Sequence, residues 1–173
     1  KWVAYLKEHP LTGSQLPRLG TAGLVSSMQA HSILATRNYG AGQFEDFDKI
    51  SGETLAEDYN VNNSGCLGCT IRCRRNVKVE GKVVKGPELE TLVLFGSNLG
   101  NSDMQSVLDL NYLADELGLD TISCANTIAW AMEANEKGLW KNGLEFGKCD
   151  NLPTIFEDIA HRRGLGNELA EGS

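Results

Sequence analysis

Residues 102–118 carry the most complete helix signature in the chain. Ser102 followed by Gln105 forms a capping box, which satisfies backbone N–H groups at a helix N-terminus. Gly118 stands where glycine commonly ends a helix. Between them runs an apolar stripe at helical spacing, made of Val107, Leu110, Leu113, Ala114 and Leu117. The sequence therefore predicts an amphipathic helix that packs on a core.

Similar signals predict helices along most of the chain. Apolar residues have helical spacing in 21–34 and 121–138, and the second of these stretches stops at Gly138. Ser51 is a cap for a short helix, and Pro87 suits the first position of another. The last predicted helix has a capping box at Thr154 and Glu157 and a stop at Gly164.

One segment has a different period. Residues 76–86 alternate valine with polar residues around Glu80-Gly81, which predicts a β-hairpin. There is no βαβ alternation and no internal repeat. We predict an all-α, multihelical domain spanning residues 1–173, with one small β-hairpin after the cysteine cluster and with residues 1–50 as a partly loop-like lead-in.

Composition limits the partners and the compartment. No apolar run approaches the roughly 18 to 20 residues that span a bilayer, so no membrane segment is expected. The net charge of −7 argues against nucleic acid. Five cysteines without even spacing do not form a secreted disulfide framework, which favours a cytoplasmic protein. A local basic run is read first as a solvated hairpin face, and second as a docking site for an acidic electron carrier; it comprises Arg72, Arg74, Arg75, Lys78, Lys82 and Lys85.

Three cysteines crowd into eight residues, as Cys66, Cys69 and Cys73. If this stretch is helical, a step of about 100° per residue points all three thiols the same way. Soft thiolates select iron–sulfur clusters, zinc or cuprous copper. Zinc sites usually have paired cysteines or suitably spaced histidines, which are missing nearby, so a [4Fe–4S] cluster is favoured. Zinc and three unligated buried cysteines remain alternatives.

A fourth thiolate is not obvious in the chain. Cys124 lies in an apolar helix pattern and is read as a small core residue. Cys149 lies in a polar loop and stays open as a ligand. We expect the fourth ligand to come from outside these residues, so that the chain is a piece of something larger.

Two acidic motifs follow the cysteines. Glu88 and Glu90 lie about 200° apart on the first turn of a predicted helix, so one can favour the helix N-terminus while the other faces a site. Asp115 and Asp120 flank Gly118, and ionised carboxylates accept hydrogen bonds from a donor-rich heterocycle such as an aminopyrimidine ring. On its own, the glutamate motif is more simply read as a solvated first turn. Asp115 is unfavourable in the last turn of its helix, which invites a functional explanation, but the aspartate motif alone is a weak signal.

The three motifs in order resemble one family. "GCLGCTIRC", "GPELET" and "DELGLDTIS" are similar to the middle, helical domain of the tungsten-dependent aldehyde:ferredoxin oxidoreductases, and the likeness runs from about Leu19 to the chain end. The resemblance implies a [4Fe–4S] cluster on Cys66, Cys69 and Cys73, with a fourth cysteine from a later domain. It implies a tungsten or molybdenum bis-pterin as the second cofactor, with Glu90 as the acid/base near the metal. The residues that would contact the pterin are Asp115, Gly118, Leu119 and Asp120.

The implied chemistry is oxidation of an aldehyde to a carboxylic acid. Electrons would pass through the cluster to ferredoxin or a similar carrier, and the aldehyde site would be shared with the remaining domains of the same polypeptide. The isolated chain is then expected to be inactive. The alternatives are a molybdenum enzyme of the formate dehydrogenase type, a molybdenum or tungsten pterin reductase of another carbonyl substrate, and a non-catalytic iron–sulfur or zinc module.

Overall fold

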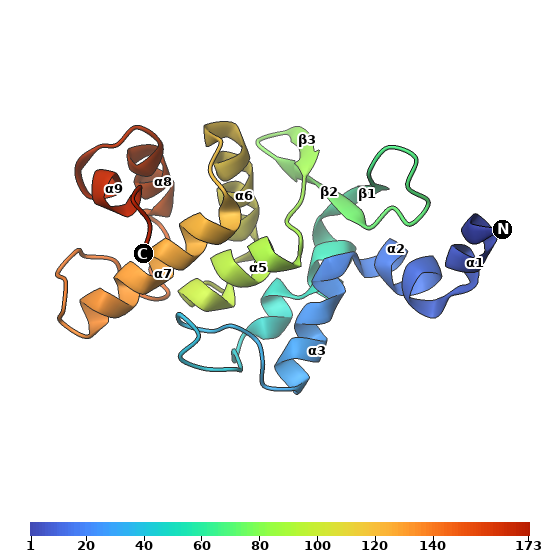
Figure 1. Ribbon diagram of the computed structural model, residues 1–173, viewed down its shortest axis with the longest axis horizontal. Coiled ribbons are helices and arrows are strands. Elements are labelled where there is room, and N and C mark those ends of the chain that lie inside the picture. The colour runs from blue at the N-terminus through green and yellow to red at the C-terminus, as the bar shows by residue number, and fades with distance from the viewer.

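The computed structural model describes residues 1–173 as a chain of helices with one small sheet (Figure 1). The helices are α1 (Trp2–Glu8), α2 (Leu16–Leu19), α3 (Leu24–Ala30), α4 (Gly52–Thr54), α5 (Leu89–Phe95), α6 (Met104–Leu117), α7 (Thr121–Glu136), α8 (Leu152–Ala160) and α9 (Gly164–Leu169). The strands are β1 (Asn60–Ser64), β2 (Arg74–Val79) and β3 (Lys82–Lys85). Short 3-10 or π turns occupy residues 11–15, 21–23, 47–50, 55–59 and 97–99.

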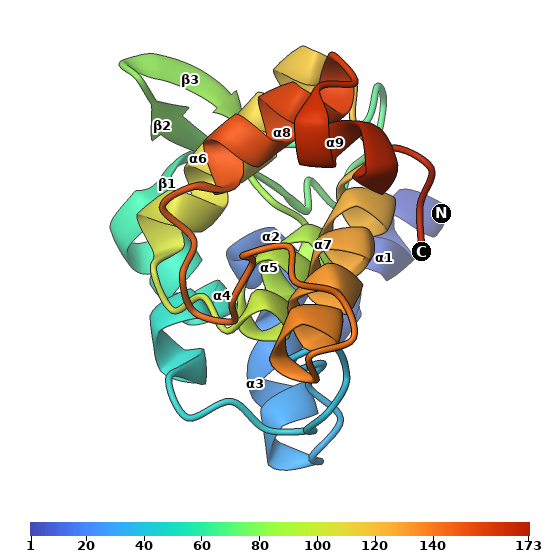
Figure 2. The same ribbon diagram turned by 90° about the vertical axis from the view of Figure 1, so that its left-hand side faces the viewer.

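Helix α5 forms the centre of the core. Its residues from Thr91 to Phe95 are all buried, and it packs against α7. The Phe95 ring lies 5.3 Å from that of Phe156, so α8 shares the same core. Figure 2 shows α8 and α9 lying across α6 and α7, whereas α1 and α2 lie at the opposite end of the molecule in Figure 1. After the exposed Glu90 on its first turn, α5 is almost entirely apolar, which explains why the rest of the helix is buried on all sides.

The three strands form an antiparallel meander in the order β1-β2-β3. The predicted hairpin is present as β2 and β3, and Glu80 (φ 50°) and Gly81 (φ 80°) make its two-residue turn. Positive φ at both turn residues matches the right-handed twist of the strands. Asn111 on α6 donates a hydrogen bond to the Lys85 carbonyl at 2.9 Å, which ties the sheet to the helices.

Strand β1 was not predicted. It pairs with β2 through a register that shifts between Asn60 and Asn62, and it has no apolar alternation. The side chains of Asn62 and Asn76 form a cross-strand hydrogen bond of 2.8 Å. The fold is therefore a helical domain with a small three-stranded sheet, rather than with a hairpin alone.

Several predicted helix ends are wrong. The cap of α6 is Asp103, whose carboxylate accepts from the Gln105 N–H at 3.0 Å, and not Ser102. Asn101 accepts from the Asp103 N–H and so fixes this geometry. Pro87 precedes the cap of α5, which is Glu88, so the proline is not the first helical residue.

Of the other predicted helix ends, some are wrong and some are confirmed. Helix α8 begins at Leu152, ahead of the predicted box at Thr154, and Gly164 opens α9 instead of closing α8. The predicted helix 21–34 is a 3-10 turn followed by the shorter α3. Ser51 does cap its short helix by accepting from the Thr54 N–H, and Gly118 and Gly138 adopt the left-handed conformation expected at helix ends.

Residues 1–50 contain α1 to α3 and an irregular stretch after them. That stretch is held against the core, because the Arg37 and Asn38 N–H groups donate to the carbonyls of Ser97 and Asn98. Arg37 also forms an ion pair with Glu136 at the end of α7, with N···O 2.6 Å. None of the helices combines the length and the apolar content needed to span a bilayer.

Candidate functional site

The three clustered cysteines lie in the loop 65–73 between β1 and β2. The Cys69 N–H donates to the Cys66 carbonyl at 3.0 Å, and Gly68 (φ 74°) completes this turn. Cys66 and Cys69 are exposed and Cys73 is half-buried. The stretch is a loop between β1 and β2 and not a helix, so the condition under which helical spacing would point all three thiols the same way is not met. No three Cys, His, Asp or Glu side chains of the chain are close enough together to form a metal-ligating group.

The surroundings of Cys69 and Cys73 act on their thiols in opposite directions. Backbone hydrogen bonds from Ile71, and then from Arg72, lower the pKa of the Cys69 thiol. Burial, and then the nearby Glu88 carboxylate, raise the pKa of the Cys73 thiol. N–H groups directed at cysteine sulfur are a general feature of iron–sulfur sites. The surroundings of Cys69 therefore favour the thiolate form that ligates a metal, whereas those of Cys73 favour the neutral thiol.

The other two cysteines of the chain lie outside the cysteine loop and are not exposed as a fourth ligand would be. Cys124 on α7 and Cys149 before α8 are both buried in the apolar core. Burial raises the pKa of Cys124 to about 12 and that of Cys149 to about 11, which keeps both thiols neutral. The prediction that Cys124 is a core residue is confirmed, and Cys149 is a core residue as well.

Arg75 secures the cysteine loop from the sheet side. Its side chain is only 2% exposed, so the reading of the basic run as a solvated face is wrong at this position. It donates to the carbonyls of Pro17, Arg18 and Arg72 at 2.8, 2.6 and 2.9 Å. One sequence signal could have revealed it, because Arg75 shares the buried face of β2 with Val77 and Val79 at strand period.

Gly20 allows α2 to approach the cysteine loop. A Cβ atom at this position would lie 2.6 Å from the Cys73 carbonyl oxygen. The next residue, Thr21, donates its hydroxyl to Glu88 at 2.8 Å and accepts from the Leu89 N–H at 3.0 Å. The start of α5 therefore lies against the same segment that supports the cysteines.

The two glutamates have different surroundings. Glu88 is half-buried and caps α5, whereas Glu90 is exposed on the first turn of the helix. This matches the prediction that they face different ways. An acid/base role for Glu90 calls for a buried carboxyl group, and the residues of this chain leave it open to solvent.

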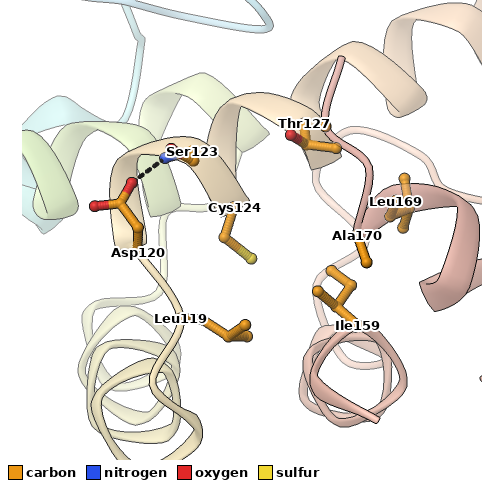
Figure 3. A pocket seen from close by; sticks show the side chains of 9 residues that line it. Leu119, Asp120, Ser123, Cys124, Thr127, Ile159, Leu169 and Ala170 are labelled. Carbon is orange, nitrogen blue, oxygen red and sulfur yellow. Dashed lines mark hydrogen bonds between the residues drawn. The ribbon is translucent and has the colours of Figure 1, made fainter. Parts of the chain in front are cut away.

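The aspartate motif forms the corner between α6 and α7. Gly118 (φ 69°) ends α6, and the Asp120 carboxylate accepts from the Ser123 N–H at 2.7 Å as the cap of α7 (Figure 3). Hydrogen bonds from the backbone and side chain of Ser123 lower the pKa of Asp120. Asp115 and Asp120 are both exposed, so each keeps acceptor capacity for a ligand.

A cavity of about 160 Å³ opens beside this corner. Its walls come from α7, α8 and α9, and in Figure 3 the Cys124 side chain points into the space between Leu119 and Ile159. Thr127 and Leu169 close another side. The cavity is mainly apolar and shares Leu119 and Asp120 with the predicted cofactor motif.

One hydrogen bond joins the glutamate and aspartate motifs. The hydroxyls of Thr91, next to Glu90, and Thr121, next to Asp120, lie 2.8 Å apart. At the start of α5, Glu88 accepts a hydrogen bond from Thr21, and the adjacent Gly20 lies against the Cys73 carbonyl. All three motifs therefore belong to one continuous set of contacts.

Comparison with known families decides the relationship. The family described as "Aldehyde ferredoxin oxidoreductase, domains 2 & 3" matches residues 1–173, which is the entire chain. The chain belongs to the aldehyde ferredoxin oxidoreductase family. The resemblance inferred from the three motifs is confirmed, and it extends upstream of Leu19 to the first residue.

Named members of the aldehyde ferredoxin oxidoreductase family are similar over nearly all of the chain. A tungsten-containing aldehyde ferredoxin oxidoreductase of Pyrococcus abyssi is 40% identical over 180 residues, and one of Thermococcus kodakarensis is 39% identical over 176 residues. These matches cover 98% and 97% of this chain but only 30% and 29% of the relatives. The chain thus spans about a third of the length of the curated aldehyde ferredoxin oxidoreductases it matches.

Two further matches are more distant. The WOR-like subunit of an aliphatic sulfonate oxidoreductase from Pyrococcus furiosus is 32% identical over 116 residues, which covers 61% of this chain and 19% of that protein. The BamBC active-site complex of benzoyl coenzyme A reductase superposes with a TM-score of 0.72 at 22% identity, over 99% of this chain and 28% of the other. The second match shows that this chain shares its fold with part of a chain of that complex.

Proposed function

We propose that the chain is the middle, helical part of an oxidoreductase that oxidises aldehydes to carboxylic acids. The observation that carries this proposal is the continuous set of contacts that joins the cysteine, glutamate and aspartate motifs in a chain of this family. Named relatives that are 40% and 39% identical to the chain are tungsten-containing aldehyde ferredoxin oxidoreductases, which supports tungsten over molybdenum and ferredoxin as the electron acceptor.

The cysteine loop would hold a [4Fe–4S] cluster. Cys66, Cys69 and Cys73 supply three thiolates, and the N–H groups of Ile71 and Arg72 help to stabilise negative charge on sulfur. The fourth ligand would come from residues beyond this chain, since Cys124 and Cys149 are core residues. Because Cys66 and Cys69 are exposed, another part of the polypeptide can approach them to provide that ligand.

The corner between α6 and α7 would bind the pterin part of a tungsten bis-pterin. Asp115 and Asp120 would supply carboxylate acceptors for N–H groups of the pterin, and Gly118 and Leu119 form the turn between the two aspartates. When bound, the tungsten centre would accept two electrons, which the cluster would pass on one at a time.

Glu90 would move the proton. Its carboxylate accepts a proton from water or from an aldehyde hydrate and releases it after turnover. Because the residue is exposed in this chain, its burial would have to come from another part of the polypeptide. The isolated chain is therefore expected to be inactive.

An electron carrier would dock near the cysteine loop. Besides the buried Arg75, the basic run includes Arg72, Lys78, Lys82 and Lys85 on the exposed surface of the loop and hairpin. Positive charge there favours an acidic carrier such as ferredoxin. All five cysteines are free thiols, and we propose the reducing cytoplasm as the compartment.

The metal test uses the full-length oxidoreductase purified without oxygen. In Cys66→Ala, iron content and the EPR signal of the reduced cluster should fall strongly, because an exposed ligand is lost. The matched control is Cys149→Ala, which removes a buried thiol and should keep the iron. A Cys66→Ala protein with the parent's iron and signal, or a parent that holds zinc instead of iron, would contradict the proposed cluster.

The same protein tests the proton role. Glu90→Gln should lower turnover by about 10²- to 10⁴-fold with tungsten and iron unchanged, the usual range for loss of an acid/base. Glu116→Gln, which changes an exposed glutamate on α6, should leave turnover unchanged. Near-parent turnover in Glu90→Gln removes that residue from the reaction.

A further inference from the structure

A short loop after α3 has left-handed backbone at three consecutive positions. Arg37, Asn38 and Tyr39 have φ values of 48°, 51° and 61°, although none of them is glycine. Left-handed backbone is unfavourable for residues with a Cβ atom and normally occurs at isolated positions. Such a run persists only where the surrounding structure holds it in place, and it is a reason to look for a function.

The loop 37–39 is held by α7. Each of its three side chains forms a polar contact with that helix, at 2.6, 2.6 and 3.2 Å, and the pairs are Arg37–Glu136, Asn38–Glu133 and Tyr39–Asn126. The fully buried Asn98 also accepts from the Tyr39 N–H at 3.2 Å. The strained backbone is therefore fixed in one place on the surface of α7.

Trp130 lies on the face of α7 that the loop contacts. Asn126 is one turn before Trp130 and Glu133 is one turn after it, so helical spacing places the three side chains on one face. Trp130 is 43% exposed, and its ring centroid lies 5.8 Å from that of Trp140. A hollow of about 360 Å³ opens beside these two rings, and its other walls are Glu133, Ala134, Lys137 and Leu139.

The surface around Trp130 is apolar, because the charges beside it are paired within the chain. Arg37 pairs with Glu136, and Lys137 pairs with Glu133 at N···O 2.5 Å. The exposed groups that remain are rings and aliphatic carbon, and we call them the α7 aromatic surface; they comprise Tyr39, Trp130, Leu139 and Trp140. Tryptophan and tyrosine are typical of the centres of protein interfaces. This surface therefore suits an apolar segment of protein.

We propose that an apolar segment of the same full-length polypeptide, from outside residues 1–173, covers the α7 aromatic surface. The relatives supply the reason for this occupant, since the chain matches only 30% and 29% of their length. A segment of the same polypeptide is present at high effective concentration, which favours it over a second copy or a separate partner. The loop 37–39 fixes Tyr39 beforehand, so less conformational freedom is lost on docking.

The inference rests on one part of the proposed function, namely that the chain belongs to a longer polypeptide. It does not depend on the proposed reaction or on either proposed cofactor. Because no unpaired charge takes part, the contact should also persist at high salt.

The test places the photo-crosslinker p-benzoylphenylalanine at position 130 of the full-length oxidoreductase, where it replaces one aromatic side chain with another. Irradiation and peptide mass spectrometry should link position 130 to a peptide outside residues 1–173 of the same molecule, at low and at high salt. The matched control is the same crosslinker at position 24. Leu24 is 42% exposed on α3 and lies outside the α7 aromatic surface, so its crosslinks should be weak.

Three outcomes would overturn the proposal. A crosslinked dimer would show that a second copy covers the surface, and a missing crosslink would show that it stays open to solvent. Equal yields from positions 130 and 24 would show that the surface is not selected. If a crosslinker at position 130 prevents folding, the same measurement from position 39 decides. Loss of iron, tungsten or turnover bears only on the proposed reaction, because the crosslinks report contact alone.

A second variant tests the part played by the strained loop. Asn38→Ala removes the hydrogen bond to Glu133 and should lower the crosslinking yield from position 130, because Tyr39 is then held less firmly. An unchanged yield would contradict the positioning role of the loop.

Discussion

At the scale of single residues, Gly20 shows how little room separates the cysteine loop from α2. Its backbone (φ 68°, ψ −165°) lies in a region used almost only by glycine. The Cys73 carbonyl also lies where a side chain would begin. Gly118 has a similar φ of 69° but open space around it. The two glycines can therefore be compared: both have positive φ, but only Gly20 is also in close contact with another part of the chain.

Replacing each glycine by alanine should separate backbone strain from close contact. Gly118→Ala should lower the free energy of unfolding by about 1–2 kcal/mol, because only the left-handed conformation is strained. Gly20→Ala should lower it by more than about 3 kcal/mol, since strain and a backbone clash act together. Urea unfolding of both variants measures the difference. Equal losses would mean that the loop moves aside at little cost.

At the scale of elements, the corner between α6 and α7 combines a structural and a proposed functional role in Asp120. Its carboxylate caps α7 through the Ser123 N–H, and the adjacent Thr121 bonds to Thr91 on α5. A capping residue holds its backbone and side chain in one arrangement. The corner is therefore preorganised without a bound cofactor.

Asp120→Ala should destabilise the chain by about 1 kcal/mol, the usual effect of losing a helix cap, while Asp120→Asn should lose much less. The pKa of Asp120 is lowered in the folded chain, so its ionic contribution is present above the ordinary value of 3.8 and is lost as the pH falls through the lower folded value. Thermal unfolding between pH 7 and pH 3 measures this contribution. A pH profile identical in the parent and in Asp120→Asn would argue against it.

Helix ends were predictable from sequence where one residue alone could satisfy the geometry. Gly118 and Gly138 are such positions, because left-handed backbone favours glycine. At the start of α6, Ser102 and Asp103 are both good caps, and the choice depends on a hydrogen bond from Asp103 to Asn101. Strand β1 was missed because asparagine side chains, rather than apolar alternation, support its pairing.

At the scale of the whole molecule, the sequence predicted which motifs form the candidate site but not how these motifs are placed relative to one another. The residue types in the cysteine, glutamate and aspartate motifs identified the family. Their mutual placement depends on Thr21, Thr91 and Thr121, which carry no recognisable signal in sequence. Two of the three carbonyls that bind Arg75, those of Pro17 and Arg18, lie more than fifty residues upstream, so its burial was predictable only from its shared face with Val77.

The core as a whole should become less stable at high pH because of its two buried thiols. The pKa of Cys124 is raised to about 12 and that of Cys149 to about 11, above the ordinary 9.0. A raised folded pKa means that stability is complete below pH 9 and falls as the pH rises towards the folded values.

Cys124→Ala should reduce this alkaline loss, although the variant is less stable at pH 7 because it leaves a small cavity. Chemical unfolding at pH 7 and pH 10 gives the change in the free energy of unfolding with pH, its slope, for the parent and for Cys124→Ala. Cys66→Ala, which changes an exposed cysteine, is the control and should keep the parent's slope. An unchanged slope in Cys124→Ala would show that this thiol does not ionise on unfolding in that range.

The meander of the sheet has a consequence for the timing of assembly. The loop 65–73, both strands that flank it, and the carbonyls that bind Arg75 all lie between residues 17 and 85. Chains emerge from the ribosome N-terminal end first. The contacts that hold the cysteine loop and its arginine anchor can therefore be made during synthesis, before α5 and the corner between α6 and α7 have emerged.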